Sequence, residues 1–440
     1  MRHSDAKRPN RKILILLMAI LLGVIAAWRA QAPDVSAAEI PALAPQWQSP
    51  PPGLRLSTNA AYPPQGADGP AIARAPSGPT IMAVYSHRVT SIVDRDPYYT
   101  IFNGQSWSTP AAVRVTPGTD SGQLALTYGA GNAAHLVWDE PGNGLVYMRH
   151  DGSGWGGFKT IAATTLPVFG ADISAYGNNI IDVVWAAKPG PSPNPNVYHS
   201  RSTDGGNTWS SPAPIIETAP TSQAPKIAHD ANGVAHVVWQ ERTAMLRSET
   251  RYVRGLPWSQ PIVISSSQIE SDRRPALAIA ASTVHVAFAR SLGVDSSNSD
   301  QWAYYTQCSS NCTAPQSWSL PMNASGQPVR VNESAPFDLI PEIASHDGCA
   351  YIFYHGYVQN VSSNEVIWNV NSCDGWSGGG RDQVTGFDMR GIYPRVVMVG
   401  NAIRLVYEWV DGNNHQIYTM HGILPAGPAG GIFLPAVARR

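Results

Sequence analysis

The stretch IIDVVWAAKPGPSPNPNVYHSRSTDGGNTWSSP, residues 180–212, decides the fold. It contains a short apolar run that ends in an aromatic residue (DVVW), a second short run (VYHSR), a turn rich in Gly and Asp, and a Trp-Ser-x-Pro segment. The two runs are rich in β-branched and aromatic residues and are separated by Pro, Gly and Asn, which is typical of strands joined by turns. This arrangement predicts a small meander of antiparallel strands.

The same elements recur along the chain in the same order. The Trp-Ser-x-Pro segment or a degenerate copy of it occurs seven times, 48 to 60 residues apart, at Trp47, Trp107, Trp155, Trp209, Trp258, Trp318 and Trp376. The apolar run ends at Tyr85, Trp138, Trp185, Trp239, Phe288, Tyr354 and Tyr407. Four β-rich segments per unit, at a period of about fifty residues, are the signature of a β-propeller blade.

We therefore predict an all-β fold, a seven-bladed β-propeller of four-stranded blades that spans residues 39–424. No Trp-Ser-Pro segment follows the last unit, whereas a spare copy at Trp47 precedes the first unit. We expect an N-terminal strand with this spare copy to complete the last blade, because that pairing would leave no open sheet edge.

Residues 1–38 are predicted to be a signal peptide or an N-terminal anchor. Basic residues precede an unbroken apolar run at 13–28, and small residues follow it, which is the layout of a secretory signal. Ser36-Ala37-Ala38 before Glu39 supplies the small side chains that signal peptidase requires. The alternative is an uncleaved anchor, since the 16 apolar residues fall slightly short of the usual ~20 of a membrane span. We expect a secreted or extracytoplasmic protein.

The composition excludes several classes of protein. Only 14% of the residues are charged, and the formal net charge is −1. Removing residues 1–32 leaves 24 basic and 30 acidic side chains, so the remaining chain is mildly acidic and has no basic stripe for nucleic acid. A coiled coil, a disordered acidic chain and a multi-span membrane protein are also excluded. We expect a monomer with no cofactor, no nucleic-acid partner, and no membrane contact except through residues 13–28.

The four cysteines fall into two pairs. Cys308 and Cys312 flank a three-residue loop, and Cys349 and Cys373 bracket a longer run. If that run is a hairpin with its turn near Val361, Cys349 lies opposite Cys373, where a disulfide is geometrically reasonable. Two isolated pairs without clustered histidines are unlike a zinc site. We therefore predict two disulfides, which fit an oxidising compartment, and no metal site.

The segment STDGGNTW resembles the Asp-box, the S-x-D-x-G-x-T-W hairpin of sialidases and related BNR-repeat propellers. Its five defining positions are present at Ser202, Asp204, Gly206, Thr208 and Trp209. Ser202 and Asp204 can cap backbone N–H groups of a tight turn, and Gly206 can adopt a positive φ. The resemblance implies a structural hairpin at the rim of a blade and leaves the activity open.

Residues that recur from unit to unit are predicted to be structural. His135, His236 and His285 occupy the same position in three units, and the Trp of the Trp-Ser-x-Pro segment recurs once per blade. We expect the histidines to be packed or hydrogen-bonded and the Trp side chains to pack between adjacent blades. The alternative for the Trp residues is a platform on which sugars stack.

Charged residues gather in loops that are predicted to meet at one mouth of the central channel. These loops follow the second strand of each blade or lead into its innermost strand. We expect a polar ligand to be bound there, by Glu140, Glu241, Arg242, Arg290, His355, Glu408, Asp272 and Arg274. Ordinary solvated loops are the alternative.

The resemblance to sialidases implies further roles. That family grips a carboxylate with three arginines, and its first arginine comes from an F/Y-R-I-P motif. The segment DRRPAL resembles this motif with Arg273 in the matching place, although Asp272 replaces the aromatic residue and Arg274 replaces the Ile. Sialidases are six-bladed, whereas this sequence counts seven units.

Sialidases also use a Tyr–Glu nucleophile pair. Tyr393 could be such a nucleophile beside a carboxylate such as Glu342 or Glu408, and Arg395 and Arg290 could supply further guanidinium groups for a carboxylate. The resemblance thus gives the catalytic candidates Arg273, Arg395, Tyr393 and Glu342. Other enzyme signatures, such as G-x-S-x-G, H-E-x-x-H and a phosphate-binding Gly-Lys loop, are absent from the sequence.

Residues 425–440 form a Pro/Gly-rich tail with a short apolar end, which is too short to span a membrane. Sorting to a surface and a frayed terminus are equally open for it. We predict an exported β-propeller that binds a glycan or a cell-surface glycoconjugate through its charged channel mouth. A sialidase-like exo-glycosidase and a protein-interaction scaffold without a small ligand are the alternatives.

Overall fold

The computed structural model describes most of the chain between residues 45 and 424. The described residues are 45–48, 52–57, 67–88, 94–163, 168–188, 194–217, 220–244, 247–265, 270–292, 300–324, 329–330, 339–357, 365–372, 382–384, 390–411 and 414–424. The chain divides into two units, residues 1–42 and 43–440, and all described residues belong to the second. The predicted signal segment at 1–38 and the tail at 425–440 lie outside the described residues.

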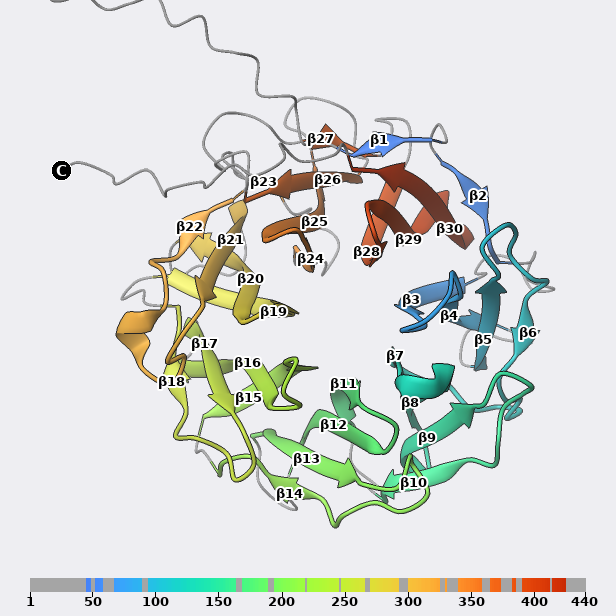
Figure 1. Ribbon diagram of the computed structural model, residues 1–440, viewed down its shortest axis with the longest axis horizontal. Coiled ribbons are helices and arrows are strands. Elements are labelled where there is room, and N and C mark those ends of the chain that lie inside the picture. The colour runs from blue at the N-terminus through green and yellow to red at the C-terminus, as the bar shows by residue number, and fades with distance from the viewer. Residues whose placement is uncertain are drawn as a thin grey trace, which may run out of the picture. The chain divides into compact units, whose positions relative to one another are not determined.

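The strands form sheets arranged around a common centre (Figure 1). Four of the sheets are meanders of four consecutive antiparallel strands. They consist of β3 (Ala67–Arg74), β4 (Ile81–Arg88), β5 (Arg95–Phe102) and β6 (Ala111–Ala112); β7 (Leu124–Tyr128), β8 (Ala134–Glu140), β9 (Gly144–His150) and β10 (Lys159–Ala162); β11 (Val168–Tyr176), β12 (Ile180–Ala187), β13 (Asn196–Ser202) and β14 (Ala213–Pro214); and β15 (Thr221–His229), β16 (Ala235–Ala244), β17 (Arg247–Arg254) and β18 (Ile262–Val263).

Two further sheets are larger. One has nine strands: β19 (Glu270–Ala280), β20 (Thr283–Leu292), β21 (Asp300–Cys308), β22 (Met322–Asn323), β23 (Val329–Arg330), β24 (Glu342–His346), β25 (Cys349–Tyr357), β26 (Glu365–Asn371) and β27 (Asp382–Gln383). The other joins β28 (Arg390–Val399), β29 (Ala402–Asp411) and β30 (Asn414–Ile423) to β1 (Gln46–Trp47) and β2 (Leu54–Arg55). Short 3₁₀ helices lie at η1 (Ala130–Asn132) and η2 (Pro315–Ser317). Within the described ranges, no helix has the length and hydropathy to cross a membrane.

The all-β propeller with four-stranded blades is confirmed, but the predicted count of seven blades is wrong, because the described strands form six hydrogen-bonded sheets. The difference arises at β23. This strand pairs with β21 on one side and with β25 on the other. It thereby joins two four-stranded meanders, β19–β22 and β24–β27, into one sheet.

The first and the last described strands belong to the same sheet. In β1, Gln46 pairs with Ile423 and Trp47 with Gly422 of β30. The Trp47 ring makes an edge contact with the ring of Phe353, with centroids 6.5 Å apart. β2 pairs with β30 as well, further from the end of that strand.

The aromatic residue that ends each apolar run lies in the core. All seven of these residues are at most 1% exposed: Tyr85, Trp138, Trp185, Trp239, Phe288, Tyr354 and Tyr407. Each lies on the second strand of its meander, so burying its ring fixes that strand between the neighbouring meanders.

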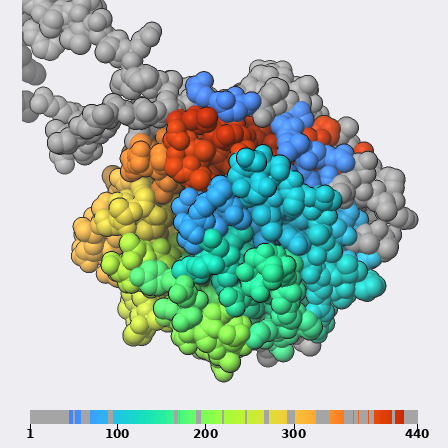
Figure 2. All heavy atoms as spheres, turned by 45° about the vertical axis from the view of Figure 1, so that its right-hand side comes forward, coloured from blue at the N-terminus to red at the C-terminus, as the bar shows by residue number. Residues whose placement is uncertain are grey.

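The Trp of the Trp-Ser-x-Pro segment packs against the third strand of the preceding meander. Ring centroids lie 5.5 Å apart for Trp155 and Tyr99, 5.0 Å for Trp209 and Tyr147, 5.1 Å for Trp258 and His199, and 4.9 Å for Trp318 and Tyr252, each in an edge-to-face arrangement. The predicted packing between adjacent units is therefore confirmed for these four Trp residues. Figure 2 shows the first units of the ring, coloured blue to green, side by side in sequence order.

The Ser of the same segment has a local reason to recur. Its hydroxyl accepts a hydrogen bond from a backbone N–H of the third strand in four units: Ser108 from Ile101 (3.0 Å), Ser210 from Arg201 (3.0 Å), Ser259 from Arg254 (3.2 Å) and Ser319 from Gln307 (3.0 Å). The side chain thus satisfies a donor just where the outer strand begins to pair.

The hairpin at Ser202–Trp209 is held by its own side chains. Asp204 Oδ1 accepts from the backbone N–H groups of Asn207 (2.9 Å) and Thr208 (2.8 Å), and the N–H of Gly206 donates to Ser202 Oγ (2.8 Å). Gly206 has φ +90°, and a Cβ there would lie 2.0 Å from the hydroxyl of Tyr147. The turn therefore requires glycine for its backbone and for its neighbour.

One of the two predicted disulfides is confirmed, and the other stays a prediction. Cys308 and Cys312 form a disulfide with Cα atoms 5.7 Å apart. The hairpin of β25 and β26 has the predicted register, since Tyr351 lies opposite Asn371 and Tyr357 opposite Glu365. Cys349 is disulfide-bonded, and its predicted partner Cys373 lies outside the described residues.

We expect Gly206→Ala to destabilise the protein by about 3 kcal/mol or more, because it adds a left-handed alanine and forces Tyr147 to move. The matched control is Gly152→Ala in the equivalent hairpin of the preceding meander, where φ is +100° and nothing lies within 4 Å of an added Cβ. That control should cost only about 1–2 kcal/mol. Urea unfolding of both variants measures the difference, and equal losses would contradict the packing argument.

Candidate functional site

A left-handed residue interrupts five of the innermost strands near their start. The register shifts between Asp68 and Ala71, Phe169 and Ala171, Gln223 and Lys226, Arg273 and Ala276, and Ile392 and Arg395. The residues with positive φ inside these bulges are Gly69, Gly170, Ala224, Arg274 and Tyr393. A β-bulge bends its strand and redirects the side chains that follow. These five strands therefore have the same kind of bulge near the same end.

The preceding meander holds these bulges in place. The N–H of Gly69 donates to Glu408 Oε2 (3.2 Å), and the N–H of Arg274 faces Gln240 Oε1 at 3.4 Å. At a third junction the ring of Tyr393 meets the ring of His355 edge to face, 5.6 Å apart. Glu408, Gln240 and His355 each follow directly after a buried aromatic residue. At three junctions between meanders, the residue directly after the buried aromatic therefore contacts the bulge of the next meander.

Asp272 and Arg290 form a buried pair across β19 and β20. Arg290 donates from Nε to Asp272 Oδ1 (2.6 Å) and from Nη2 to Oδ2 (3.0 Å), and its guanidinium lies 4.4 Å from the centre of the Tyr304 ring. Asp272 is 1% exposed and Arg290 is 5% exposed. This bidentate pair fills the interior of the sheet.

Other predicted ligand-binding residues are also engaged. Glu140 accepts from Asn143 Nδ2 (2.6 Å) and pairs with Arg114 (3.2 Å), and Glu241 pairs with Arg251 (3.0 Å). Six of the eight are buried: Glu140, Glu241, Arg290, His355, Glu408 and Asp272. Arg242 is exposed and Arg274 is half-buried. Their binding role stays a prediction, whereas their contacts show them fastening strands and meanders.

One level of the innermost strands carries four charged side chains. On each innermost strand, one residue lies opposite the residue that comes just before the buried aromatic of the second strand. In chain order these residues are Ala71, Ala125, Asp172, Lys226, Ala276, Glu342 and Arg395. Because these positions share one register, they lie at one height around the centre. The charges alternate in sign, from Asp172 and Lys226 to Glu342 and Arg395, and three alanines complete the level.

These four charges form two loose ion pairs. Asp172 Oδ1 lies 3.5 Å from Lys226 Nζ, and Glu342 Oε2 lies 3.5 Å from Arg395 Nη1. Their side chains keep 19–32% of their surface exposed. Burial raises the pKa of Glu342. The charges of Arg395 and Lys226 act to lower this pKa, whereas the charge of Asp172 acts to raise it. The two ion pairs therefore interact electrostatically. This level offers both carboxylate acceptors and cationic donors.

The predicted catalytic candidates are brought together only in part. Glu342 and Arg395 are paired, whereas Arg273 lies on β19 with its Nε 3.5 Å from Ser271 Oγ, and the Tyr393 ring contacts His355. The sequence analysis missed Asp172 and Lys226. The sequence does contain a signal for them. Near the start of six innermost strands comes one of the triplets GPA, GAD, APK, RPA, IPE and YPR, and the third residue of each triplet lies at this level.

The recurring histidines are buried and bonded to tyrosines. His135, His236 and His285 each have Nδ1 2.7 Å from a hydroxyl, of Tyr147, Tyr252 and Tyr305 respectively. They are 1–3% exposed. Burial lowers the pKa of each to about 4, so all three are neutral at neutral pH.

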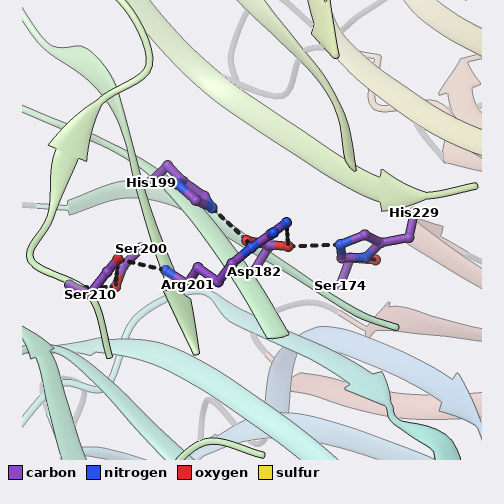
Figure 3. Close-up of polar contacts among 7 residues, drawn as sticks. All are labelled: Ser174, Asp182, His199, Ser200, Arg201, Ser210 and His229. Atoms are coloured by element: carbon purple, nitrogen blue, oxygen red, sulfur yellow. Dashed lines mark hydrogen bonds and ion pairs between the residues drawn. The ribbon is translucent and has the colours of Figure 1, made fainter. Parts of the chain in front are cut away.

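The meander β11–β14 departs from this pattern. Asp182 occupies the position of the recurring histidine, because it comes three residues before the buried Trp185. His199 occupies the position of the tyrosine, because it pairs with Val184, the residue just before Trp185. Asp182 accepts from His199 Nε2 (2.6 Å), Arg201 Nε and Nη2 (both 2.7 Å) and His229 Nε2 (2.7 Å) of the next meander. Figure 3 shows these donors converging on the carboxylate, with Ser174 beside the His229 ring. Burial alone would raise the pKa of Asp182, but these hydrogen bonds hold it well below its usual range.

No metal centre is formed by the part of the chain that the structure describes, where no three His, Cys, Asp or Glu side chains group suitably for an ion. The Asp182 carboxylate is instead saturated by nitrogen donors.

Comparisons with known proteins find only distantly similar solved structures. No family model matches the chain, and no curated protein matches it. A protein of unknown function from Dyadobacter fermentans is 14% identical over 82% of this chain and 95% of its own, with a TM-score of 0.47. Trypanosoma rangeli sialidase in complex with sialic acid is 10% identical over 81% of this chain, with a TM-score of 0.43, and this chain spans only 54% of its length. Penicillium chrysogenum α-L-arabinanase is 9% identical over 69% of this chain and 93% of its own, with a TM-score of 0.46.

We expect Arg290→Met to destabilise the protein by about 3–5 kcal/mol, because it leaves the carboxylate of Asp272 buried without its cation. The double variant Arg290→Met/Asp272→Leu should recover most of this loss, since it removes both charges. Urea unfolding tests both. A single variant as stable as the parent would show that Arg290 is not a structural residue.

We expect stability to fall as the pH is lowered from 6.5 towards 4. In this window an unfolded histidine binds a proton, whereas His135, His236 and His285 remain neutral in the fold. Each of these three histidines should lower the free energy of unfolding by about 2 kcal/mol between pH 6.5 and pH 5. Urea unfolding at several pH values measures the slope, which His285→Gln should reduce because it removes one of these contributions. An unchanged slope in His285→Gln would contradict a buried, neutral His285.

Proposed function

We propose that the protein binds a glycan at the level formed by Asp172, Lys226, Glu342 and Arg395. The observation that carries this proposal is the alternation of acidic and basic side chains at one height of the innermost strands. A sugar hydroxyl both donates and accepts hydrogen bonds, so alternating carboxylates and cations suit a row of hydroxyls. The ion pairs at 3.5 Å leave donors of Lys226 and Arg395 available, and the side chains stay partly exposed.

A sialidase-like exo-glycosidase is the second candidate. It is favoured by Glu342, because burial raises the pKa of this carboxyl group and a raised pKa suits a general acid. The pairing of Arg290 with Asp272 speaks against a cluster of three available arginines. We therefore place binding ahead of hydrolysis.

A glycan array followed by calorimetry with the best glycan tests the binding proposal. Lys226→Ala and Glu342→Gln should each weaken binding about tenfold or more, because each removes a charge-assisted hydrogen bond. Lys159→Ala is the control, since Lys159 lies on the outer strand β10 and donates to Asn207 O (2.6 Å). Glycan binding that is unchanged in both Lys226→Ala and Glu342→Gln would exclude this level as the binding site. Release of fluorophore from aryl sialosides or other aryl glycosides, lost in Glu342→Gln, would favour the second candidate.

We also propose that the chain acts outside the cytoplasm. The support is the Cys308–Cys312 disulfide together with the N-terminal sequence pattern. Recovery of the protein with free thiols from the cytoplasmic fraction alone would contradict this location.

We further propose that β1 closes the ring of sheets. Seven innermost strands follow one another around the centre, β3, β7, β11, β15, β19, β24 and β28, and β28 lies against β3. The pairing of β1 with β30 gives the last sheet its outer strand. An experimental structure with β1 detached from β30 would refute the closure.

A further inference from the structure

Ser174 and His229 extend the Asp182 cluster towards the innermost strands. Ser174 Oγ lies 2.8 Å from His229 Nδ1, and His229 Nε2 lies 2.7 Å from Asp182 Oδ2. Ser174 is half-buried on β11, the innermost strand that also carries Asp172. The two residues are two positions apart, so they share a face of the strand and lie roughly 7 Å apart along it.

The chemistry of Asp182 fixes which nitrogen of His229 carries the proton. An ionised carboxylate only accepts hydrogen bonds, so His229 Nε2 must donate to it. In the neutral ring Nδ1 then has the free lone pair, and it faces the hydroxyl of Ser174 (Figure 3). Arg201 and His199 bind the same carboxylate and keep it ionised. The order is hydroxyl, imidazole, carboxylate.

The internal repeat shows that the fold does not require this arrangement. The position equivalent to Ser174 is Thr127 in the meander β7–β10 and Ala228 in the meander β15–β18, each opposite the recurring histidine. Three units have a His–Tyr pair here, and in one of them His236 Nε2 also lies 3.4 Å from Asp230 Oδ2. This unit instead has Asp182, His199, Arg201, His229 and Ser174. A unit that breaks a repeated structural rule is where a function beyond folding is expected.

We propose that Ser174 is a nucleophile, activated by His229 and Asp182, that attacks short-chain carboxylic esters. Nucleophile, base and orienting carboxylate of this kind are recognised by geometry rather than by sequence position, which explains why the absent G-x-S-x-G motif does not exclude them. A small acyl group suits a serine that is half-buried on an innermost strand.

The reaction balances with water as the only co-reactant. Ser174 Oγ attacks the carbonyl carbon while its proton passes to His229 Nδ1. The bond from that carbon to the alkoxy oxygen breaks, and the proton on Nδ1 is given to the departing alkoxide. Water then attacks the acyl-serine, its proton passes through the same nitrogen back to Ser174 Oγ, and the carboxylic acid leaves. Asp182 holds the imidazole and stabilises its charged form.

The test uses the folded protein, an alkyl fluorophosphonate and p-nitrophenyl acetate. The fluorophosphonate should add one phosphonyl group with loss of fluoride, and peptide mapping should place it on Ser174. Ester hydrolysis should fall by about 10²-fold or more in Ser174→Ala and by about 10²–10⁴-fold in His229→Gln. Ser200→Ala is the control, because Ser200 lies on β13 between His199 and Arg201 but donates to Ser210 O (2.7 Å). Its labelling should match that of the parent.

Labelling of the parent protein decides the proposal even if a variant fails to fold. A folded parent that gains no phosphonyl group, or gains it on another residue, would overturn the assignment of Ser174. Hydrolysis that persists in folded Ser174→Ala would do the same. The assay uses no glycan, so its outcome is independent of sugar binding at Asp172, Lys226, Glu342 and Arg395.

Discussion

The structure depends on the contact between neighbouring meanders, where an aromatic wedge from one unit enters the third strand of the unit before it. Trp155, Trp209, Trp258 and Trp318 make this contact with ring centroids about 5 Å apart. Each sheet is apolar on both faces, so no unit can bury its surface alone, and it must be flanked on both sides. A ring of units meets this requirement, and the Ser after each Trp secures the outer strand that carries the wedge.

The same requirement determines where charge is used. At the bulged ends of the innermost strands, Glu408 satisfies a backbone N–H of the next unit, Gln240 faces another, and His355 packs against Tyr393. An unpaired buried backbone group costs free energy, so polar side chains there are engaged by the fold before any ligand arrives. The charges that stay partly exposed lie at the next level, at Asp172, Lys226, Glu342 and Arg395.

The period of the repeat made the strands, the buried aromatic residues, the Trp wedges and the register of the hairpin beyond Cys349 predictable, because each follows from spacing along one unit. The number of sheets was not, since β23 pairs across two units and no local pattern specifies that bridge. The charged loops misled for a similar reason. Asp272 and Arg290 are far apart in sequence, and only the register of β19 and β20 shows that they neutralise each other. Asp182 could have been noticed as the aspartate in a histidine position.

The pairing of β1 with β30 has a consequence for the order of events during synthesis. Gln46 and Trp47 leave the ribosome early, whereas their partners Ile423 and Gly422 are among the last described residues to appear. The first described strand therefore stays unpaired until the residues of β30 have been made. Contacts of such long sequence separation form late and slowly, and a strand that stays unpaired is exposed to wrong partners. Shortness protects it, because β1 has only two residues and presents little edge for another chain to extend.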